Sequence, residues 1–363
     1  MTRILFVTNG HGEVSIAKRI AQELRCLGAF ATEHLALVGA DLGDEAFVDV
    51  GPQALMPSGG LVAMGNVRAF AADVGAGFFA LLGRQLAFLR WARARYAAVV
   101  AVGDVYALLL ARVARRPAVF VGTAKSVHVA GYGPVERAIL RTARRVFVRD
   151  PATAEFLRAR NVAAEAPGNV IVDLLETQHH VDWGAAVERL ALLPGSRERA
   201  YNDALRLAGI ARRVAHRVPG CAAMLSIAPG LDAARFAPAL AGEPPIAAWR
   251  DDLGALLVHA TLALGQAGTA NEAAAACGVP VVAFEFDGAR KPAWYRMRQA
   301  RLLGDALAIV PGDAERAADA IAALLADGAR RAHMSQVGRQ RMGARGGAAA
   351  IARAVATLTL PLR

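Results

Sequence analysis

The junction "LALGQAGTANEAAAACG" (262–278) places small and polar residues between an apolar, strand-like run and an alanine-rich helix. The residues at this junction are Gln266, Gly268, Thr269, Ala270, Asn271 and Glu272. A helix N-terminus offers unpaired N–H groups and a partial positive charge, and glycine lets a phosphate approach the backbone. The pattern predicts a diphosphate at 268–270, with Glu272 accepting ribose hydroxyls. The same pattern fits a capping box, in which Thr269 and Glu272 only satisfy the helix end.

A second junction, "LALLPGSRER" (190–199), ends another strand-like run with a turn. Gly195, Ser196 and Arg197 follow the break at Pro194. A guanidinium at this position can neutralise a leaving phosphate through its forked donors. The alternative is a solvated arginine after a tight turn. Both junctions lie in the second half of the chain, which predicts one shared nucleotide site.

Two junctions in the first half carry groups suited to proton transfer. The first is "VTNGHGEVSIA" (7–17), which contributes Asn9, Gly10, His11, Gly12 and Glu13, and it lacks the G-x-G-x-x-G dinucleotide pattern. His11 can act as a base or orient a substrate, although a lone loop histidine is often incidental. The second, "AVGDVYALLL" (101–110), offers Asp104 either as a general base reaching into an interdomain cleft or as a helix N-cap.

Short apolar runs that alternate with helical patterns position these junctions. The expected strands are 3–9, 34–39, 97–103, 118–122, 145–150, 189–195, 222–228, 261–264 and 280–284, and the expected helices include 15–28, 200–218 and 347–358. Such alternation is typical of parallel sheets covered on both faces. It occurs twice, with a loosening near 164–170, which predicts an α/β protein of two Rossmann-like, doubly wound domains facing a cleft.

These domains are expected at 1–165 and 166–345, with 346–363 as a C-terminal helix that could return to the first domain. Ligands of such sheets bind beyond the carboxyl ends of the strands. We therefore expect the ligands of both domains at the turns that follow their strands.

The composition narrows the class of protein. The chain has 363 residues, 55% of them hydrophobic, and a net charge of +11. No leader sequence and no apolar run long enough to span a bilayer is evident, so we expect a cytoplasmic protein. The scattered Cys26, Cys221 and Cys277 form no metal-ligand spacing and fit a reducing compartment. Basic runs interleaved with aromatics are absent, which favours an anionic lipid or phosphorylated substrate over nucleic acid.

The segment 61–96 mixes apolar and aromatic residues with arginines. Its aromatic residues include Phe78, Phe79 and Trp91, and its arginines include Arg84 and Arg90. This composition is typical of a helix lying in the interface of an anionic membrane. An ordinary core helix with a solvated arginine face fits it equally well. The first interpretation predicts a peripheral protein on the inner face of the cytoplasmic membrane.

Several motifs together resemble lipid-A-disaccharide synthase and its relatives within the GT-B glycosyltransferases. The matching segments are "LLPGSRERAYN" (192–202), "GQAGTANEAAAACGVPVV" (265–282), "PGNVIVDLL" (167–175), "MPSGGLVAMGN" (56–66) and "VGDV" (102–105). The resemblance covers most of the chain and is specific in the second domain. It departs from the family in the first loop, which lacks the family's aspartate, and at Asn169, where the family has histidine.

The resemblance implies an inverting transfer of a sugar from a UDP-sugar to a lipid-linked acceptor. It also implies that the 166–345 domain binds the nucleotide-sugar and that the 1–165 domain binds the acceptor. Arg197 and the 268–270 helix end would hold the diphosphate, Glu272 the ribose, and Asp104 or His11 would accept the acceptor's proton. No Asp-x-Asp occurs in the chain, which fits transfer without a metal or other cofactor. Two alternatives remain: a UDP-N-acetylglucosamine 2-epimerase-like enzyme, and a nucleotide-sugar-binding protein without transferase activity.

Overall fold

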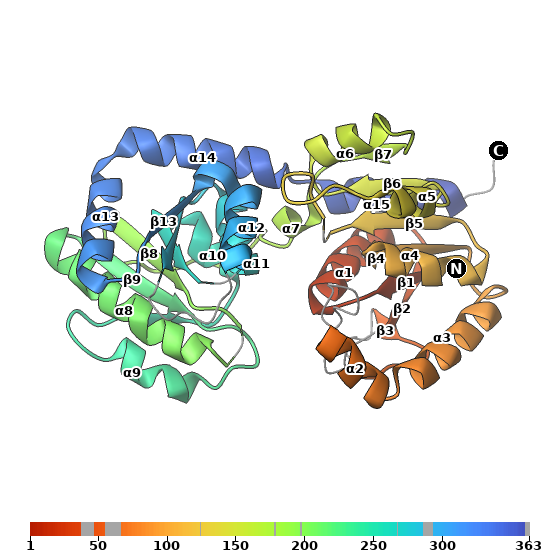
Figure 1. Ribbon diagram of the computed structural model, residues 1–363, viewed down its shortest axis with the longest axis horizontal. Helices are drawn as coiled ribbons and strands as arrows, with labels where there is room; N and C mark the ends of the chain where they lie inside the picture. The colour runs from red at the N-terminus through yellow and green to blue at the C-terminus, as the bar shows by residue number, and fades with distance from the viewer. Residues whose placement is uncertain are drawn as a thin grey trace. The chain divides into compact units, whose positions relative to one another are not determined.

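The computed structural model forms two compact units (Figure 1). It describes residues 1–37, 47–54, 67–123, 125–177, 179–196, 198–266, 268–285 and 293–359, without the side chains of 11, 67–70 and 293–295. Unit 1 comprises Met1–Leu174 and Ala344–Arg363, and unit 2 comprises Leu175–Gly343. Figure 1 shows the blue C-terminal helix α15 (Gly347–Thr359) among the red-to-yellow elements of unit 1.

Within the described residues, unit 1 holds a parallel sheet of seven strands in the order β3-β2-β1-β4-β5-β6-β7. The strands are β1 (Thr2–Thr8), β2 (Phe30–Ala36), β3 (Val48–Asp49), β4 (Ala98–Gly103), β5 (Ala118–Gly122), β6 (Arg145–Val148) and β7 (Ala164–Glu165). The chain moves outward from β1 to β3 in one direction and from β4 to β7 in the other. The winding direction therefore reverses between β1 and β4, and ligands of such sheets bind at this reversal.

Helices cover both faces of this sheet. They are α1 (His11–Cys26), α2 (Val67–Gly75), α3 (Phe78–Ala92), α4 (Val105–Ala111), α5 (Pro134–Leu140), α6 (Pro151–Arg158), α7 (Val170–Asp173) and α15. Because side chains alternate along a strand, Leu5 and Val7 pack with the cluster that α3–α6 complete. Ile4 and Phe6 pack on the other face, where α1 and α15 complete the cluster. The C-terminal helix is therefore part of the core of unit 1.

Unit 2 repeats the plan. Its described residues form a six-stranded parallel sheet in the order β10-β9-β8-β11-β12-β13. The strands are β8 (Glu188–Leu193), β9 (Cys221–Ser226), β10 (Ala247–Trp249), β11 (Leu262–Gly265), β12 (Val281–Glu285) and β13 (Leu307–Pro311). Here the winding direction reverses between β8 and β11, which are hydrogen-bonded neighbours.

The helices of unit 2 are α8 (Ala200–Arg217), α9 (Ala237–Leu240), α10 (Leu253–Val258), α11 (Gly268–Cys277), α12 (Ala293–Leu303), α13 (Ala314–Ala326) and α14 (Gly328–Met342). The alanine content of α11 has a packing reason. A Cβ on Gly338 of α14 would lie 2.6 Å from the carbonyl oxygen of Ala275. Because α14 approaches α11 this closely, both surfaces must be small. No helix in the described ranges has the length and apolar content needed to cross a membrane.

A buried carboxylate fixes the return of the chain from unit 2 to unit 1. Asp173 accepts hydrogen bonds from the backbone N–H of Gly346 at 2.6 Å and of Ala348 at 2.7 Å. The carboxylate thereby caps the N-terminus of α15, where negative charge is stabilising. A Cβ on Gly168 (φ 145°) would lie 2.7 Å from the backbone nitrogen of Gly347, so the approach of these segments requires glycine.

The predicted fold class, two Rossmann-like doubly wound domains, is confirmed. The expected strands are present with shifts at their ends, and the largest shift is the strand expected at 34–39, observed at Phe30–Ala36. The helix expected at 15–28 begins earlier, at His11. The described part of segment 61–96, residues 67–96, contains two helices, α2 and α3, rather than one. The sequence placed the domain boundary at 165/166 and 345/346, and the compact units divide at 174/175 and 343/344.

Replacing Asp173 by alanine should destabilise unit 1, because two backbone N–H groups at the start of α15 lose a charged acceptor. We expect a loss of about 2–4 kcal/mol in the free energy of unfolding. Urea denaturation followed by circular dichroism measures it. Asp305→Ala, which removes an exposed carboxylate from unit 2, is the control and should change stability by about 0.5 kcal/mol or less. Equal midpoints for the two variants would contradict the assigned role of Asp173.

Candidate functional site

The two junctions that the sequence singled out in unit 2 lie side by side at the strand reversal. In the register of the sheet Gly265, the last residue of β11, pairs with Leu193, the last residue of β8. One residue further on, the backbone N–H of Gln266 donates to the carbonyl oxygen of Leu193 at 3.2 Å. The turn after β8 and the loop before α11 therefore emerge from adjacent points on one sheet edge.

The turn after β8 (194–196) leaves the polar residue Ser196 exposed to solvent. Pro194 is buried, and Gly195 has a φ of 111°, a left-handed conformation that favours glycine. This conformation turns the chain at the sheet edge and leaves Ser196 exposed. Arg197, the predicted phosphate ligand, lies outside the described residues.

Helix α11 begins at Gly268, so Thr269 lies inside its first turn. A capping box needs its threonine at the residue before the helix, and this arrangement does not provide it. Thr269 is exposed and Glu272 is partly exposed, while Ala273–Ala276 are buried. The first turn of α11 therefore presents the backbone of Gly268, Thr269 and Ala270 at the reversal of the sheet, the position at which α/β proteins bind phosphate.

Two residues predicted to touch the nucleotide make contacts within the protein. The side chain of Gln266 donates to the carbonyl oxygen of Phe284 at 3.1 Å, which ties the loop to β12. Asn271 is fully buried, and a Cβ on Gly265 would lie 1.8 Å from its Oδ1. Asn271 can occupy this position only because residue 265 is glycine. Through these contacts Gln266 and Asn271 support the loop before α11 from inside the protein.

Unit 1 brings its two predicted junctions together in the same way, at the reversal between β1 and β4. The side-chain amide of Asn9 donates to Oδ2 of Asp104 at 3.0 Å. Oδ1 of Asp104 accepts from the backbone N–H groups of Tyr106 at 3.0 Å and Ala107 at 3.2 Å. Asp104 is thus the N-cap of α4, and three of the roughly four lone-pair sites of its carboxylate are occupied. Burial, with Asp104 nearby, raises the pKa of Tyr106 to about 12, so its phenol stays protonated.

A second carboxylate, Glu13, lies against both junctions. A Cβ on Gly10 would lie 2.6 Å from Oε2 of Glu13, and one on Gly103 would lie 3.0 Å from its Cγ. Glycine at both positions leaves room for the Glu13 side chain beside Asp104. His11 is the first residue of α1, but its side chain lies outside the described residues. Gly12 is exposed, and, among the described residues beyond its chain neighbours and its own helix backbone, no atom lies within 4 Å of the position a Cβ would take.

A buried hydrogen-bond chain, which the sequence did not reveal, supports the end of β1. The Thr8 hydroxyl lies 2.8 Å from Nε2 of His34, and Nδ1 of His34 bonds to the Asp49 carboxylate. Because an ionised carboxylate only accepts, Nδ1 of His34 donates to Asp49. Thr8 and His34 are both at most 1% exposed. These hydrogen bonds therefore hold Thr8, the residue before Asn9, in place, and their buried side chains cannot reach a substrate.

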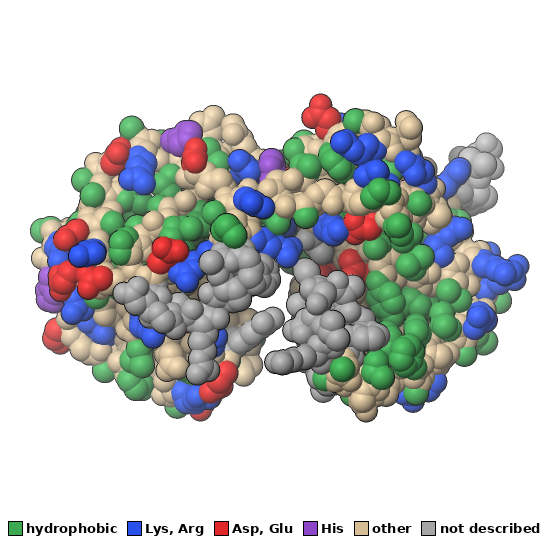
Figure 2. Space-filling view, in the orientation of Figure 1, with side chains coloured by type: hydrophobic (Ala, Val, Ile, Leu, Met, Phe, Trp, Pro, Cys, Tyr) green, Lys and Arg blue, Asp and Glu red, His purple; other side chains and the backbone are tan. Residues whose placement is uncertain are grey.

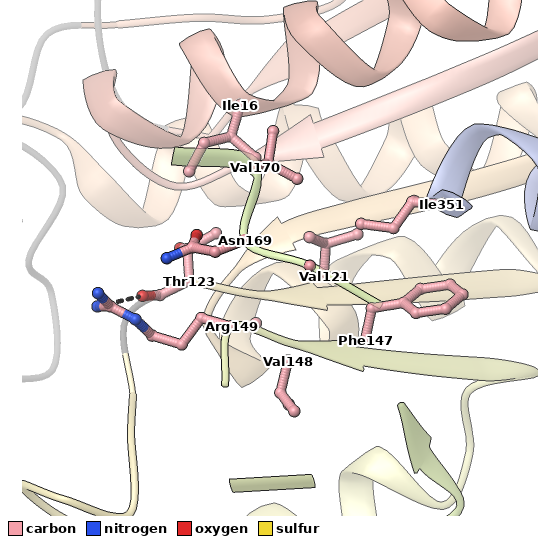
Figure 3. Close-up of a pocket in the computed structure, with 11 residues that line it drawn as sticks. Ile16, Val121, Thr123, Phe147, Val148, Arg149, Asn169, Val170 and Ile351 are labelled. Atoms are coloured by element: carbon pink, nitrogen blue, oxygen red, sulfur yellow. Dashed lines mark hydrogen bonds between the residues drawn. The ribbon is translucent and has the colours of Figure 1, made fainter. Parts of the chain in front are cut away.

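A small pocket opens further along the same edge of unit 1, at the carboxyl ends of β5 and β6 (Figure 3). Its polar lining residues are Thr123, Arg149 and Asn169. Thr123 directly follows the strand predicted at 118–122, so the rule that located Asp104 could also have located it. Arg149 falls inside the strand predicted at 145–150 and follows β6 only in the structure, where β6 ends at Val148. Asn169 comes from the segment after β7 and gave no such signal. Among the described residues, no group of three or more His, Cys, Asp or Glu side chains is placed to hold a metal ion.

Solved structures of glycosyltransferases and of a putative UDP-N-acetylglucosamine 2-epimerase share this fold. The calicheamicin glycosyltransferase CalG4 aligns over 99% of this chain and 98% of its own, with a TM-score of 0.64 and 17% identity. A putative UDP-N-acetylglucosamine 2-epimerase from Listeria monocytogenes aligns over 98% and 95%, with a TM-score of 0.62 and 14% identity. The spinosyn rhamnosyltransferase SpnG, complexed with thymidine diphosphate, aligns over 98% and 100%, with a TM-score of 0.60 and 19% identity.

At these identities the likeness shows the fold alone, and it is the GT-B type that the sequence predicted. No protein-family model matches the chain, and no curated protein matches it.

Proposed function

We propose that this chain is a glycosyltransferase that moves a sugar from a UDP-sugar to an acceptor hydroxyl, in the manner of lipid-A-disaccharide synthase. The proposal rests on one observation: the four predicted junctions lie next to each other in two pairs. The turn after β8 meets the loop before α11, and Asn9 meets Asp104, each pair at the reversal of its own sheet. The similarity to CalG4 and SpnG supports the same class of reaction.

Unit 2 binds the donor in this proposal. The backbone N–H groups at 268–270 and the turn at Gly195–Ser196 receive the diphosphate, with Arg197 as the cation, and Glu272 binds the ribose. Negative charge grows on the diphosphate as the glycosidic bond breaks. Fixed N–H donors and a guanidinium therefore stabilise the transition state more than the ground state. Charge is neutralised without a metal ion.

Unit 1 binds the acceptor. The attacking hydroxyl loses its proton to Asp104 or His11, with Glu13 as a neighbouring carboxylate. Attack on the anomeric carbon occurs opposite the leaving diphosphate, so the configuration inverts. The one lone-pair site that Asp104 retains is enough to accept this hydrogen bond.

The acceptor is lipid-linked in this proposal, and α3 supplies a surface that suits a bilayer. Phe79 is 61% exposed and Trp91 is 57% exposed. At 100° per residue, both lie on the solvent face of α3 with Arg84 and Arg90. In Figure 2 hydrophobic side chains gather over the part of unit 1 that contains α3 and α4, with basic side chains along its outer edge. Aromatic groups beside arginines favour the interface of an anionic membrane.

The second candidate is a UDP-N-acetylglucosamine 2-epimerase-like enzyme, which the similarity to the Listeria monocytogenes protein favours. Both candidates bind a UDP-sugar in unit 2. They differ in the need for an acceptor, because an epimerase converts the UDP-sugar alone.

The proposal predicts that UDP raises the unfolding temperature of the protein. Ligand at a hundred times its dissociation constant adds about 2.7 kcal/mol to stability. Arg197→Ala and Glu272→Gln should each weaken UDP binding about tenfold or more, since each removes a polar contact. Arg330→Ala and Glu315→Gln, at exposed positions elsewhere in unit 2, are the controls. Absence of a shift in the wild-type protein would rule out the proposed donor site.

Asp104→Asn separates catalysis from capping. Asparagine keeps an oxygen for the N–H groups of Tyr106 and Ala107, and the amide of Asn9 can flip to present its own oxygen. We expect turnover to fall about 10²–10⁴-fold with UDP binding unchanged, if Asp104 is the base. UDP release from UDP-sugars with lipid-linked acceptors measures turnover. Unchanged turnover would assign Asp104 to capping alone, and epimerisation of UDP-N-acetylglucosamine without acceptor would favour the second candidate.

The surface of α3 predicts binding to vesicles that contain anionic phospholipid. Phe79→Ser/Trp91→Ser should weaken sedimentation with these vesicles about tenfold, because two exposed aromatic groups no longer insert. Leu205→Ser/Val258→Ser, which changes two exposed apolar residues in unit 2, is the matched control. Equal binding of both double variants would exclude α3 as the docking surface.

A further inference from the structure

Tyr132 places its hydroxyl at the carboxyl end of β5, next to the strand that leads to Asp104. A Cβ on Gly122, the last residue of β5, would lie 2.7 Å from this hydroxyl oxygen. In the register of the sheet Gly122 pairs with Gly103, and Asp104 directly follows Gly103. Because neighbouring strands are about 4.8 Å apart, the phenol lies near Asp104, beside the reversal between β1 and β4.

The Tyr132 hydroxyl makes no hydrogen bond within the described part of the chain. The residue is only 3% exposed, and none of the groups that shift its pKa is a hydrogen-bond partner. Tyr96 is buried to the same degree, and its hydroxyl bonds to Glu33. Buried tyrosine hydroxyls usually find such a partner, and a buried polar group without one lowers stability. The Tyr132 hydroxyl is therefore suited to a partner that the chain itself does not supply.

The Tyr132 hydroxyl is a hydrogen-bond donor at neutral pH. Burial, followed by the charges of three nearby carboxylates, raises the pKa of Tyr132 above its usual value. These carboxylates are those of Glu136, Asp150 and Asp104. The phenol stays protonated and can donate, whereas the Asp104 carboxylate accepts. The two groups together suit an alcohol with a second oxygen nearby, because its hydroxyl can donate to Asp104 while the second oxygen accepts from Tyr132.

Contacts on several sides hold Tyr132 in this position. The ring packs in the apolar cluster that α3–α6 complete. Nζ of Lys125 lies 5.6 Å from the ring centroid and pairs with Oε1 of Glu136 at 2.6 Å. Nη1 of Arg137 donates to the carbonyl oxygen of Tyr132 at 2.7 Å. A hydroxyl on a fixed ring can orient a substrate at little cost in side-chain entropy.

Asn9, which binds the same carboxylate, supplies a complementary group. Its Nδ2 donates to Asp104, and its Oδ1 is buried without a partner among the described residues. The Asn9 residue is 7% exposed. An amide oxygen only accepts, whereas the Tyr132 phenol donates, so the polar groups around Asp104 suit a ligand with hydroxyl groups, which do both. A phosphate or carboxylate, which only accepts, would leave the Asn9 oxygen without a partner.

We propose that Tyr132 is an acceptor-binding residue, which donates its hydroxyl hydrogen to an oxygen of the acceptor next to the hydroxyl that attacks. The attacking hydroxyl lies beside Asp104, and a further hydroxyl of the acceptor donates to Oδ1 of Asn9. This inference rests on the function proposed above, and it adds the requirement for a second oxygen close to the attacking hydroxyl. An acceptor with a lone hydroxyl loses the contact with Tyr132.

The unfolding of Tyr132→Phe separates a ligand-binding hydroxyl from a structural one. Phenylalanine keeps the ring and removes no hydrogen bond found in the described ranges. We therefore expect its urea midpoint to equal or exceed that of the wild type. Tyr96→Phe, which loses the bond to Glu33, is the matched contrast and should have a lower midpoint. A fall for Tyr132→Phe as large as that for Tyr96→Phe would assign the Tyr132 hydroxyl to the fold and overturn the proposal.

Octyl glucoside, a neutral polyol on an alkyl chain, is the probe for binding. Carbon-13 at Cζ of the five tyrosines of the full-length protein reports the hydrogen bonding of each phenol, and Tyr132→Phe identifies the resonance of Tyr132. We expect this resonance to move on titration with octyl glucoside. It should stay in place with octyl tetraethylene glycol ether, which has the same alkyl chain and a single hydroxyl. No movement with octyl glucoside, or equal movement with both probes, would contradict the role of Tyr132.

Calorimetry with the same probe measures the contribution of the hydroxyl. Tyr132→Phe should bind octyl glucoside about three- to tenfold more weakly than the wild type, because one hydrogen bond is lost. Tyr201→Phe, which removes a hydroxyl from unit 2, is the control and should bind like the wild type. Equal binding by the wild type and Tyr132→Phe would overturn the proposal.

The outcome is separable from that of the proposed function, because none of these measurements requires UDP. A protein that binds UDP but shows no response at Tyr132 keeps the proposed donor site and loses this acceptor contact. A protein in which Tyr132 responds to octyl glucoside but which never binds UDP keeps the hydroxyl-binding site and loses the proposed donor site.

Discussion

Parallel pairing of β8 with β11, and of β1 with β4, brings together chain segments that are far apart in sequence. In each sheet the backbone hydrogen bonds fix which two carboxyl ends are neighbours. In unit 1 the helices that follow these ends, α1 and α4, pack on opposite faces of the sheet, so the space between the two ends is open to a ligand. The junctions at Ser196 and Gly268 depend on this pairing, as does the contact between Asn9 and Asp104. The chemistry that these residues can perform follows from the strand order.

The two sheet edges differ in the groups they present. At the reversal in unit 2 the chain offers backbone N–H groups and a left-handed glycine, with Glu272 set back by one helical turn. The reversal in unit 1 offers two carboxylates, Asp104, which binds Asn9, and Glu13, whose side chain lies against Gly10 and Gly103. Amide donors suit a diphosphate, and carboxylates suit a hydroxyl that must lose a proton. This difference supports the proposal that unit 2 binds the donor and unit 1 binds the acceptor.

The sequence predicted the strands and the fold class because buried parallel strands are continuous apolar runs, as in β5. It also located Asp104 and the 268–270 helix end, which directly follow such runs. It did not reveal that α1 begins at His11, because the glycines at 10 and 12 resemble a loop. The sequence did not reveal the contacts of Asn271 with Gly265 or of Gln266 with Phe284 either, because these contacts join residues of the loop and helix to residues on strands. Asn169 reaches the pocket from the segment after β7, so strand periodicity gives no sign of it.

Because Asp173 binds the N–H groups at the start of α15, that helix belongs to unit 1, and unit 2 is an insertion within unit 1. Unit 2 is a continuous stretch of sequence, whereas the face of the first sheet that α1 covers lacks α15 until residues 347–359 have been made. During synthesis the nascent chain can therefore complete unit 2 while the apolar surfaces of α1 and β4 that pack against α15, such as Val100 and Val102, still lack that helix. If translation ends before α15, the released chain has a folded unit 2 and a unit 1 with exposed apolar surface. Such a chain is a substrate for chaperones or proteases.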